Sequence, residues 1–579
     1  MVFRDNKCKF VSVYNMATMF KKSEKDRQLD AFSNIPGLLD GTANKIFDDP
    51  TYWHNQFRNQ VVTPIDETIY SVLFSKTMGA PNSSLRVLIG MMILKESFGW
   101  SDSQLFEQCQ FNLLVRSSLG LFNITDALPV QSTYYLLRKR IHEYELQTGE
   151  NLIEKSFVSI TQGQVKEFEV NGRKIRMDSK LVGSNIALFS RYEIIHHALC
   201  MFIKQLDKTL WAELPSELQV QMNELLQEEP QKTLYRSTKD EIKGRLEPIG
   251  ILTYKMLQLF SGQQTDTFQL LERVFNEQYK VSSEQKVELR PKEEISSSSV
   301  QSPHDPDSAF RNKGDQKVKG YSVNITETCS DTGLSLITST IVKKANVPDT
   351  AFVKQAIEAT REVTGQKIDK VFADGAYQSP DNDTFCEGID MVYTGIQGAE
   401  SRYDLELTPQ GLLVTDTQTG DQQIAPLVKK QKNSKEDRYC IKTDKGYYYF
   451  SQQAIRTSQM RRKMKERPVE ETRKRNNVEA TIFQFGLNLN NQKSKYRGLI
   501  KQKIWSFCRC FWINLVRIMN YLRKRDNKNE SKSENQEFTT VFQLLSTIVR
   551  LITQVVIIVD DKIPMGFDPL GMNGKYRFI

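Results

Sequence analysis

Two short apolar segments, far apart in the sequence, each end in an aspartate. Residues 174–177 lead into Asp178, and residues 368–373 lead into Asp374. Short apolar runs of this kind, rich in β-branched and aromatic residues, are typical of buried strands. A carboxylate just past a buried strand lies at the rim of a sheet, where ligands bind in α/β folds. The pattern therefore predicts an α/β core with acidic side chains at one edge of its sheet.

The segments around these strands predict the rest of that core. Asn171-Gly172 favours a tight primed turn, so residues 168–170 and 174–177 are expected to form a hairpin whose second strand ends at Asp178. Residues 319–328 and 334–342 are expected to be strands, and 349–364 a helix. A later helix begins near Asn477 and carries Glu479. This order of strands, helices and acidic residues is what a ribonuclease-H-like sheet requires.

Changes in periodicity and composition divide the 579 residues into segments. We expect an N-terminal extension at 1–65 and a helical domain of DNA-binding type at 66–150. A ribonuclease-H-like core is expected at 165–186 and 303–390, interrupted by a helical insertion with a linker at 187–302. After the core we expect a β-rich insertion at 391–455, a basic segment followed by the helices that carry Glu479 at 456–522, and a tether with a C-terminal helix at 523–579. From composition alone, a plain helical bundle explains residues 66–150 equally well.

Composition and charge narrow the class of protein. Lys and Arg number 79 against 70 Asp and Glu, a net charge of +9 that favours an anionic partner. The eight cysteines form no C-x2-C pair, so no zinc finger is expected, and their spread suits a reducing compartment. No signal-peptide pattern opens the chain, and polar residues interrupt the most apolar stretch, 541–559. That stretch is typical of a packed helix rather than a membrane span, so a cytoplasmic location is expected.

Asp178, Asp374 and Glu479 are the candidate metal ligands. Carboxylate oxygens are hard ligands, and two or three of them at one point can hold Mg²⁺ or Mn²⁺. Two such ions can activate an attacking oxygen and stabilise a leaving oxygen in phosphoryl transfer. Taken singly, each carboxylate is also explained as a helix cap or as part of a solvated face.

A series of short motifs spans residues 66–522. They are SLRVLIGMMILK at 84–95, SD at 101–102, RSSLGL at 116–121, residues 129–140, IRMDSK at 175–180, DPD at 305–307, KGY at 319–321, ADGAY at 373–377, RNNVE at 475–479, YRGL at 496–499 and NL at 514–515. In their order and spacing the chain resembles DDE-type transposases of bacterial insertion sequences. The resemblance is to the branch with an N-terminal helical domain and a β-rich insertion before the final Glu.

This resemblance implies a catalytic triad of Asp178, Asp374 and Glu479, with Mg²⁺ or Mn²⁺ as the cofactor and Arg475 in contact with phosphate. It also implies DNA transposition, in which water frees a 3′-hydroxyl at the element's end and that hydroxyl attacks target DNA. Two positions depart from the family pattern, because the family's Tyr falls at Thr472 and its Lys after the Glu falls at Gly486. A Lys contact with the transposon end would then come from Lys493 or Lys495.

DNA is the expected partner, both as terminal repeats and as target. Residues 456–475 hold nine Lys or Arg against three Glu, and Arg461, Arg462 and Lys463, together with Arg497, are expected to follow DNA phosphates. Because two ends must be joined, a homodimer on DNA is expected, associated with the bacterial nucleoid. Three alternatives stay open: a solvated surface for the basic segment, a nuclease that cuts without joining, and a catalytically inactive DNA-binding protein.

Overall fold

The computed structural model describes residues 18–23, 35–314, 316–330, 333–396, 400–428, 438–443 and 446–530. The chain divides into two compact units, Met1–Tyr521 and Leu522–Ile579. Every described strand lies in the first unit, whereas the described part of the second unit is the end of the last helix.

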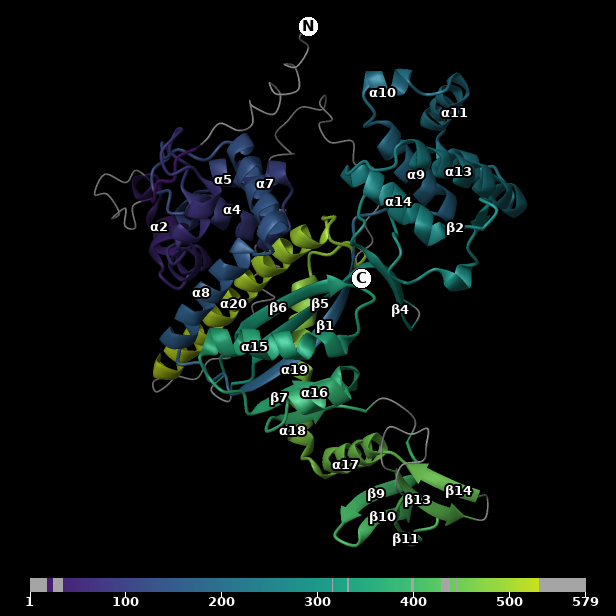
Figure 1. The fold of residues 1–579 in the computed structure, drawn as a ribbon. Coiled ribbons are helices and arrows are strands. Elements are labelled where there is room, and N and C mark those ends of the chain that lie inside the picture. Colours follow the sequence, from purple (N-terminus) through teal and green to yellow (C-terminus); the bar gives the residue numbers. More distant parts are fainter. Residues whose placement is uncertain are drawn as a thin grey trace. The chain divides into compact units, whose positions relative to one another are not determined.

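The largest sheet of the first unit has six strands and is mixed (Figure 1). Its strands are β1 (Lys174–Gly183), β4 (Ala309–Lys313), β5 (Gln316–Thr328), β6 (Ile337–Lys344), β7 (Lys370–Ala373) and β8 (Asp390–Tyr393). The order is β4-β5-β1-β7-β8, and β6 pairs with β5. β1 runs antiparallel to β5 but parallel to β7, and β7 runs parallel to β8. The α/β class, the strands near 319–328 and 334–342 and the strand before Asp374 are therefore confirmed.

The hairpin expected around Asn171-Gly172 is wrong. Helix α8 (Leu152–Glu167) continues up to residue 167, and β1 finds its partners in β5 and β7. The Asn171 side chain accepts a hydrogen bond from the Arg173 main chain, which turns the chain from helix into strand. Gly172 is needed for space, because a Cβ there would lie 2.5 Å from Thr364. β1 also continues past Asp178, since its pairing with β5 extends to Gly183.

The helix expected over residues 349–364 lies against the sheet as η5 (Asp349–Phe352) and α15 (Val353–Thr364). Its apolar face packs with Ile175 and Met177 of β1 and Val371 of β7. Met177 is fully buried and precedes Asp178. Because successive side chains of a strand point to opposite faces, the Met177 side chain lies in the core and the Asp178 side chain points to the other face. Beyond β7 follow η6 (Gly375–Tyr377) and α16 (Pro380–Phe385).

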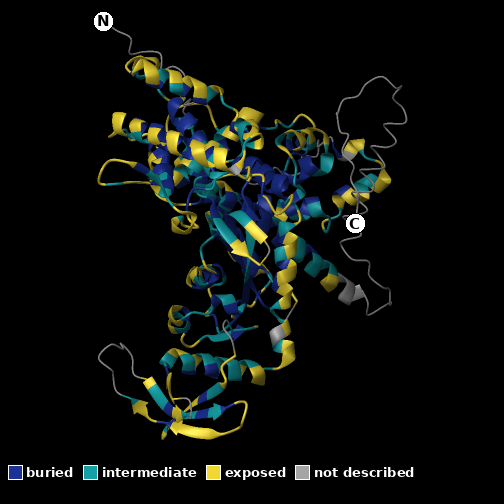
Figure 2. Ribbon diagram, turned by 90° about the vertical axis from the view of Figure 1, so that its right-hand side faces the viewer, coloured by how far each residue is buried: buried dark blue, intermediate teal, exposed yellow. Residues whose placement is uncertain are grey.

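The N-terminal part of the described chain is helical, both in the helical domain expected at 66–150 and in the extension before it, where no helix was expected. Its elements are η1 (Pro36–Leu38), α2 (Gly41–Asp48), α3 (Trp53–Phe57), η2 (Arg58–Val62), η3 (Glu67–Leu73), α4 (Leu85–Phe98), α5 (Asp102–Phe111), α6 (Leu113–Ser118), α7 (Gln131–Thr148) and α8. Ser101 caps α5, since its side chain accepts a hydrogen bond from the Gln104 main chain. One hydrophobic cluster joins these helices to β5, β6 and the last helix, α20 (Leu499–Glu530), and its buried residues are dark blue in Figure 2.

Residues 187–302 are mostly helical and have a hydrophobic core of their own. Their elements are α9 (Arg191–Ile203), α10 (Lys208–Ala212), α11 (Ser216–Gln227), α12 (Pro230–Tyr235), α13 (Lys239–Leu259), α14 (Asp266–Gln278), β2 (Tyr279–Val281), β3 (Val287–Leu289) and η4 (Lys292–Glu294). The stretch expected to be a linker, 286–303, contains β3 and the buried residues Val300 and Ser302. Its composition is that of a loop, yet part of it packs into the fold.

Between β8 and the final helices lie two three-stranded antiparallel sheets. Their strands are β9 (Tyr403–Thr408), β10 (Gly411–Asp416), β11 (Gln422–Ala425), β12 (Leu427–Val428), β13 (Arg438–Thr443) and β14 (Gly446–Phe450). Both sheets share a small core with Ile455 of α17 (Gln452–Glu466). Helices α18 (Val469–Arg473) and α19 (Asn476–Gly486) follow, and the helix expected near Asn477 is confirmed.

At the C-terminal end, the tether expected over 523–537 is helical as far as Glu530, because α20 continues to that residue. The rest of the tether and the apolar stretch 541–559 lie outside the described residues. Across the described part of the chain, no helix combines the length and the apolar character that crossing a membrane requires.

Candidate functional site

Three carboxylates from different elements surround one guanidinium group. The Arg475 guanidinium lies 3.2 Å from Asp178 and 3.9 Å from Asp374, measured from nitrogen to carboxylate oxygen. The same group lies 3.1 Å from Glu479. Asp178 belongs to β1, Asp374 follows β7, and Glu479 lies on α19. Residues separated by some three hundred positions of sequence thus share one cation.

The sheet brings the two aspartates together. β1 and β7 are parallel neighbours with Arg176 opposite Phe372, so both strands approach the same edge. Asp374 ends β7 and accepts a 2.6 Å hydrogen bond from the Gly375 main chain. A Cβ at residue 375 would lie only 2.1 Å from the Gly395 carbonyl oxygen. Glycine therefore follows Asp374 because the neighbouring backbone leaves no room for a side chain.

A buried ionic network holds the helix that carries Glu479. Glu327 of β5 is fully buried and forms ion pairs with Arg176 of β1 and Arg517 of α20. It also accepts a 2.7 Å hydrogen bond from Thr481 of α19. One carboxylate thus links β1, β5, α19 and α20, and it fixes α19 two residues from Glu479.

Exposure differs among the residues at this site. The Asp178 side chain is 16% exposed, whereas those of Asp374 and Glu479 are 45% and 58% exposed. Burial raises the pKa of Asp178, Arg475 opposes that shift, and the nearby Asp374 reinforces it. Burial and a like charge are the ordinary causes of a raised carboxyl pKa. A cation placed among these carboxylates favours their charged forms.

Lys180 is a further cation that sequence reasoning missed. It lies two residues after Asp178 on β1, so both side chains leave the same face of the strand. Its side chain fills the space above Gly486 of α19, since a Cβ there would lie 2.7 Å from Lys180 Cε. Burial lowers the pKa of Lys180. Period-two alternation from Asp178 was the available signal.

The basic segment is divided between internal ion pairs and exposed charge. On α17, Arg462 lies 3.0 Å from Asp404 and 2.6 Å from Glu406, so it ties the helix to β9. Lys463 is exposed and Arg461 is half-buried on the same helix. The role of these three residues in DNA binding stays a prediction.

The cations expected after the Glu479 helix are exposed, and each donates a hydrogen bond to a main-chain carbonyl oxygen. The pairs are Lys493 with Ile186, Lys495 with Gly99, and Arg497 with Asn185. The loop that contains Lys493 also bonds to the end of β1, because Gly183 donates to the Gln492 carbonyl oxygen. These contacts place basic side chains beside the last residues of β1.

The donor set fits a divalent cation in its chemistry. Asp178, Asp374 and Glu479 offer hard oxygen ligands of the kind that Mg²⁺ and Mn²⁺ prefer. Within the described ranges, no group of three or more His, Cys, Asp or Glu residues is gathered closely enough to hold a metal. Arg475 lies among these three carboxylates. Among the residues that the structure describes, Arg475 Nε is buried and has no hydrogen-bond partner.

The described structure is thus a mixed α/β protein with an acidic cluster at the edge of its sheet. Residues 51–140, which contain α4 to α6 and most of α7, match the model of a family described as "Transposase domain (DUF772)". That match supports a transposase family for this chain. Neither the curated proteins nor the solved structures gave a match.

Proposed function

We propose that this chain is a DDE-type transposase that cleaves DNA at the ends of an insertion sequence and transfers the strands to target DNA. One observation carries the proposal: Asp178, Asp374 and Glu479 converge on one cation, in a chain whose residues 51–140 match a transposase domain. The alternatives, a nuclease without joining activity and an inactive DNA-binding protein, predict different products in the experiment below.

The order of elements supports a ribonuclease-H-like core. A strand with Asp178 is followed by the antiparallel pair β5 and β6, helix α15, strand β7 ending at Asp374, and helix α19 with Glu479. This is the order of strands, helices and acidic residues expected of a ribonuclease-H-like sheet. The buried Glu327 network then keeps α19 against β1 and β5.

In the proposed reaction, the three carboxylates hold Mg²⁺ or Mn²⁺. When bound, these ions activate the attacking oxygen and stabilise the leaving oxygen of the phosphodiester. Arg475, whose guanidinium lies among the three carboxylates, is proposed to contact the DNA phosphate. Lys180 supplies the second positive charge, from the strand rather than from the position of Gly486. Most of the catalytic effect then comes from positioning and charge neutralisation.

The test compares two aspartates of similar exposure near β7. Asp374→Asn removes a proposed ligand, whereas Asp369→Asn removes a carboxylate that is 41% exposed and pairs with Arg173. The substrate is a plasmid that carries the DNA flanking the coding region. With Mg²⁺, wild type and Asp369→Asn should yield cleaved and joined products, while Asp374→Asn should bind the DNA without cutting it.

Each other outcome contradicts a part of the proposal. Full cleavage by Asp374→Asn would overturn the assignment of the carboxylates. Cleaved ends without joined products would identify a nuclease, and DNA binding without cleavage by the wild type would identify an inactive DNA-binding protein.

A further inference from the structure

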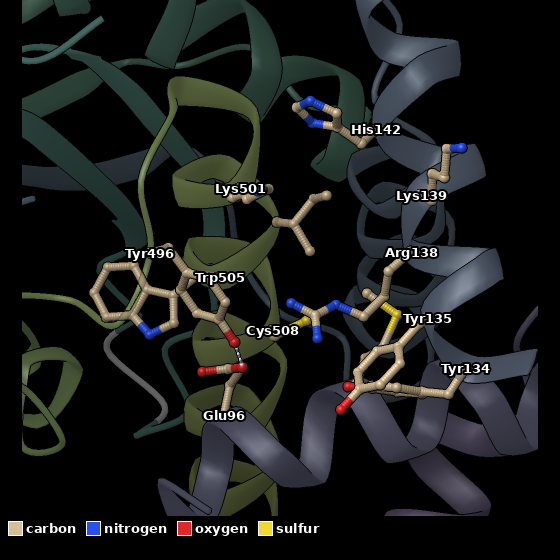
Figure 3. A pocket seen from close by; sticks show the side chains of 12 residues that line it. Glu96, Tyr134, Tyr135, Arg138, Lys139, His142, Tyr496, Lys501, Trp505 and Cys508 are labelled. Atoms are coloured by element: carbon tan, nitrogen blue, oxygen red, sulfur yellow. Dashed lines mark hydrogen bonds between the residues drawn. The ribbon is translucent and has the colours of Figure 1, made fainter. Parts of the chain in front are cut away.

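A pocket lies between α4, α7 and the beginning of α20, apart from the three carboxylates. Its volume is about 330 Å³. Figure 3 shows side chains from α7 on one side and from α20 on the other, with Glu96 of α4 at one end. The volume is at the low end of the ~300–1,000 Å³ range of ligand sites, so the pocket suits one small unit rather than a duplex.

Aromatic rings form much of the pocket wall. Tyr134 and Trp505 are 1% and 4% exposed, and Tyr496 lies beside them. Tyr135, which is 40% exposed, stands on the same turn of α7 as Tyr134. Planar rings around a space of this size provide surfaces on which a nucleobase can stack.

The lining is also rich in positive charge. Lys139 and Lys501 are exposed at the rim, and Arg138 reaches between the rings of Tyr134 and Tyr496 at 5.5 and 5.9 Å. The single acidic residue of the lining, Glu96, accepts a hydrogen bond from the Tyr496 hydroxyl. The lining therefore holds three cations and one carboxylate that is already bonded within the protein. Two of these cations also pair with carboxylates outside the lining, Arg138 with Asp102 and Lys139 with Glu143, each at 3.6 Å.

One lining group lacks a partner. His142 Nδ1 is buried and has no hydrogen-bond partner within the described structure, although the ring lines the pocket. A buried polar atom without a partner is uncommon in folded proteins. The half-buried His142 ring adds a further planar ring to the lining of the pocket.

We propose that this pocket binds one unpaired nucleotide of a DNA strand, with the base against the exposed ring of Tyr135 and the phosphate between Lys139 and Lys501. Stacking surfaces beside a positively charged rim are the combination by which proteins hold single-stranded nucleic acid. This inference rests on the proposed function, because that function brings DNA to the chain. It adds a second DNA contact, formed by the matched domain and α20.

The test uses the full chain and a short labelled oligothymidylate, whose binding is followed by fluorescence anisotropy over a range of salt concentrations. Lys139→Ala and Lys501→Ala are combined in one variant. The matched control combines Lys155→Ala and Lys354→Ala, which remove two exposed lysines from α8 and α15. All four lysines are on the surface, so each variant should fold.

The pocket variant should lower the slope of log affinity against log salt by about 0.7, the value for one phosphate contact of a single strand. Between about 50 and 200 mM salt, the wild type should lose roughly 2.6-fold more affinity than the pocket variant. The control should keep the wild-type slope within experimental error. A pocket variant that follows the wild-type curve would overturn the inference.

Two further measurements distinguish DNA binding in the pocket from free-nucleotide binding and from failure of the proposed function. Free thymidine monophosphate should displace the oligothymidylate only weakly. If it instead binds more tightly than the oligothymidylate, the pocket takes a free nucleotide and the DNA assignment is wrong. Plasmid cleavage by the same variants distinguishes failure of this inference, with cleavage intact, from failure of the proposed function, in which the wild type neither binds nor cuts DNA.

Discussion

The buried Glu327 network gives the sharpest prediction about stability. Glu327→Gln keeps the size of the side chain and removes its negative charge. The ion pairs with Arg176 and Arg517 are then lost, while both arginines stay in place with side chains only 8% and 18% exposed. Removing one partner of a buried ion pair is strongly destabilising, because the remaining charge has no compensation.

The size of the effect follows from what the arginines retain. Breaking a buried pair costs about 3–5 kcal/mol. Arg176 still donates to the Lys474 carbonyl oxygen at 3.2 Å, and Arg517 to the Ser335 carbonyl oxygen at 3.1 Å. Since these hydrogen bonds remain, we expect Glu327→Gln to lower the free energy of unfolding by an amount at the lower end of this range, about 3 kcal/mol. With a urea m-value of about 3 kcal/mol/M, the unfolding midpoint should fall by roughly 1 M.

Urea unfolding followed by tryptophan fluorescence measures this change, since Trp505 and Trp512 lie on the same helix as Arg517. The matched control is Glu358→Gln on α15, whose carboxylate is 54% exposed and lies 4.0 Å from Lys354. Exposed pairs contribute about 0–1 kcal/mol, so the control should hardly move the midpoint. If Glu327→Gln shifts the midpoint no more than the control does, the network does not hold the fold as argued.

Three further predictions concern pH, metal and DNA. Burial would raise the pKa of Glu327, but Arg517 and Arg176 outweigh that effect and hold the pKa below its ordinary value of 4.5. The difference in stability between wild type and Glu327→Gln should therefore be full at pH 7 and shrink as the pH falls below about 4.5. Urea titrations at several pH values measure this difference. Arg475→Gln should bind Mn²⁺ roughly three- to tenfold more tightly than the wild type, about 0.7–1.4 kcal/mol, because the substitution removes a competing cation. The control is Arg473→Gln, and equal Mn²⁺ affinities of the two variants would refute this prediction. Lys180→Gln should lower the salt slope of duplex DNA binding by about 0.9, measured by anisotropy, whereas Lys367→Gln should leave it unchanged.

Much of the sheet could be predicted from local pattern. The strand before Asp374 is a short buried run that ends at Ala373, and the pattern of its residues indicated both that it is a strand and where it ends. The hairpin before Asp178 could not be separated from a helix end, because Phe168 and Val170 are too few residues to show a period. The conformation of these residues is set by helix α8, because the Val170 main chain donates a hydrogen bond to the Val165 carbonyl oxygen.

The acidic residues of the candidate site and Arg475 were predictable from local motifs, whereas Lys180 was not singled out. Alternation along β1 places Lys180 on the same face as Asp178. Its contact with Gly486 joins β1 to α19, and a local pattern cannot show that contact. The ionic network around Glu327 likewise depends on four elements that meet only in the folded chain.

The most direct test of the central claim is Mn²⁺ binding by the purified chain, followed by electron paramagnetic resonance, for Asp178→Asn, Asp374→Asn and Glu479→Gln. If the three carboxylates form one metal site, each change should weaken Mn²⁺ binding, while Asp369→Asn should bind as the wild type does. Wild-type affinity in any one of the three variants would show that its carboxylate lies outside the site and would contradict the proposed catalytic centre.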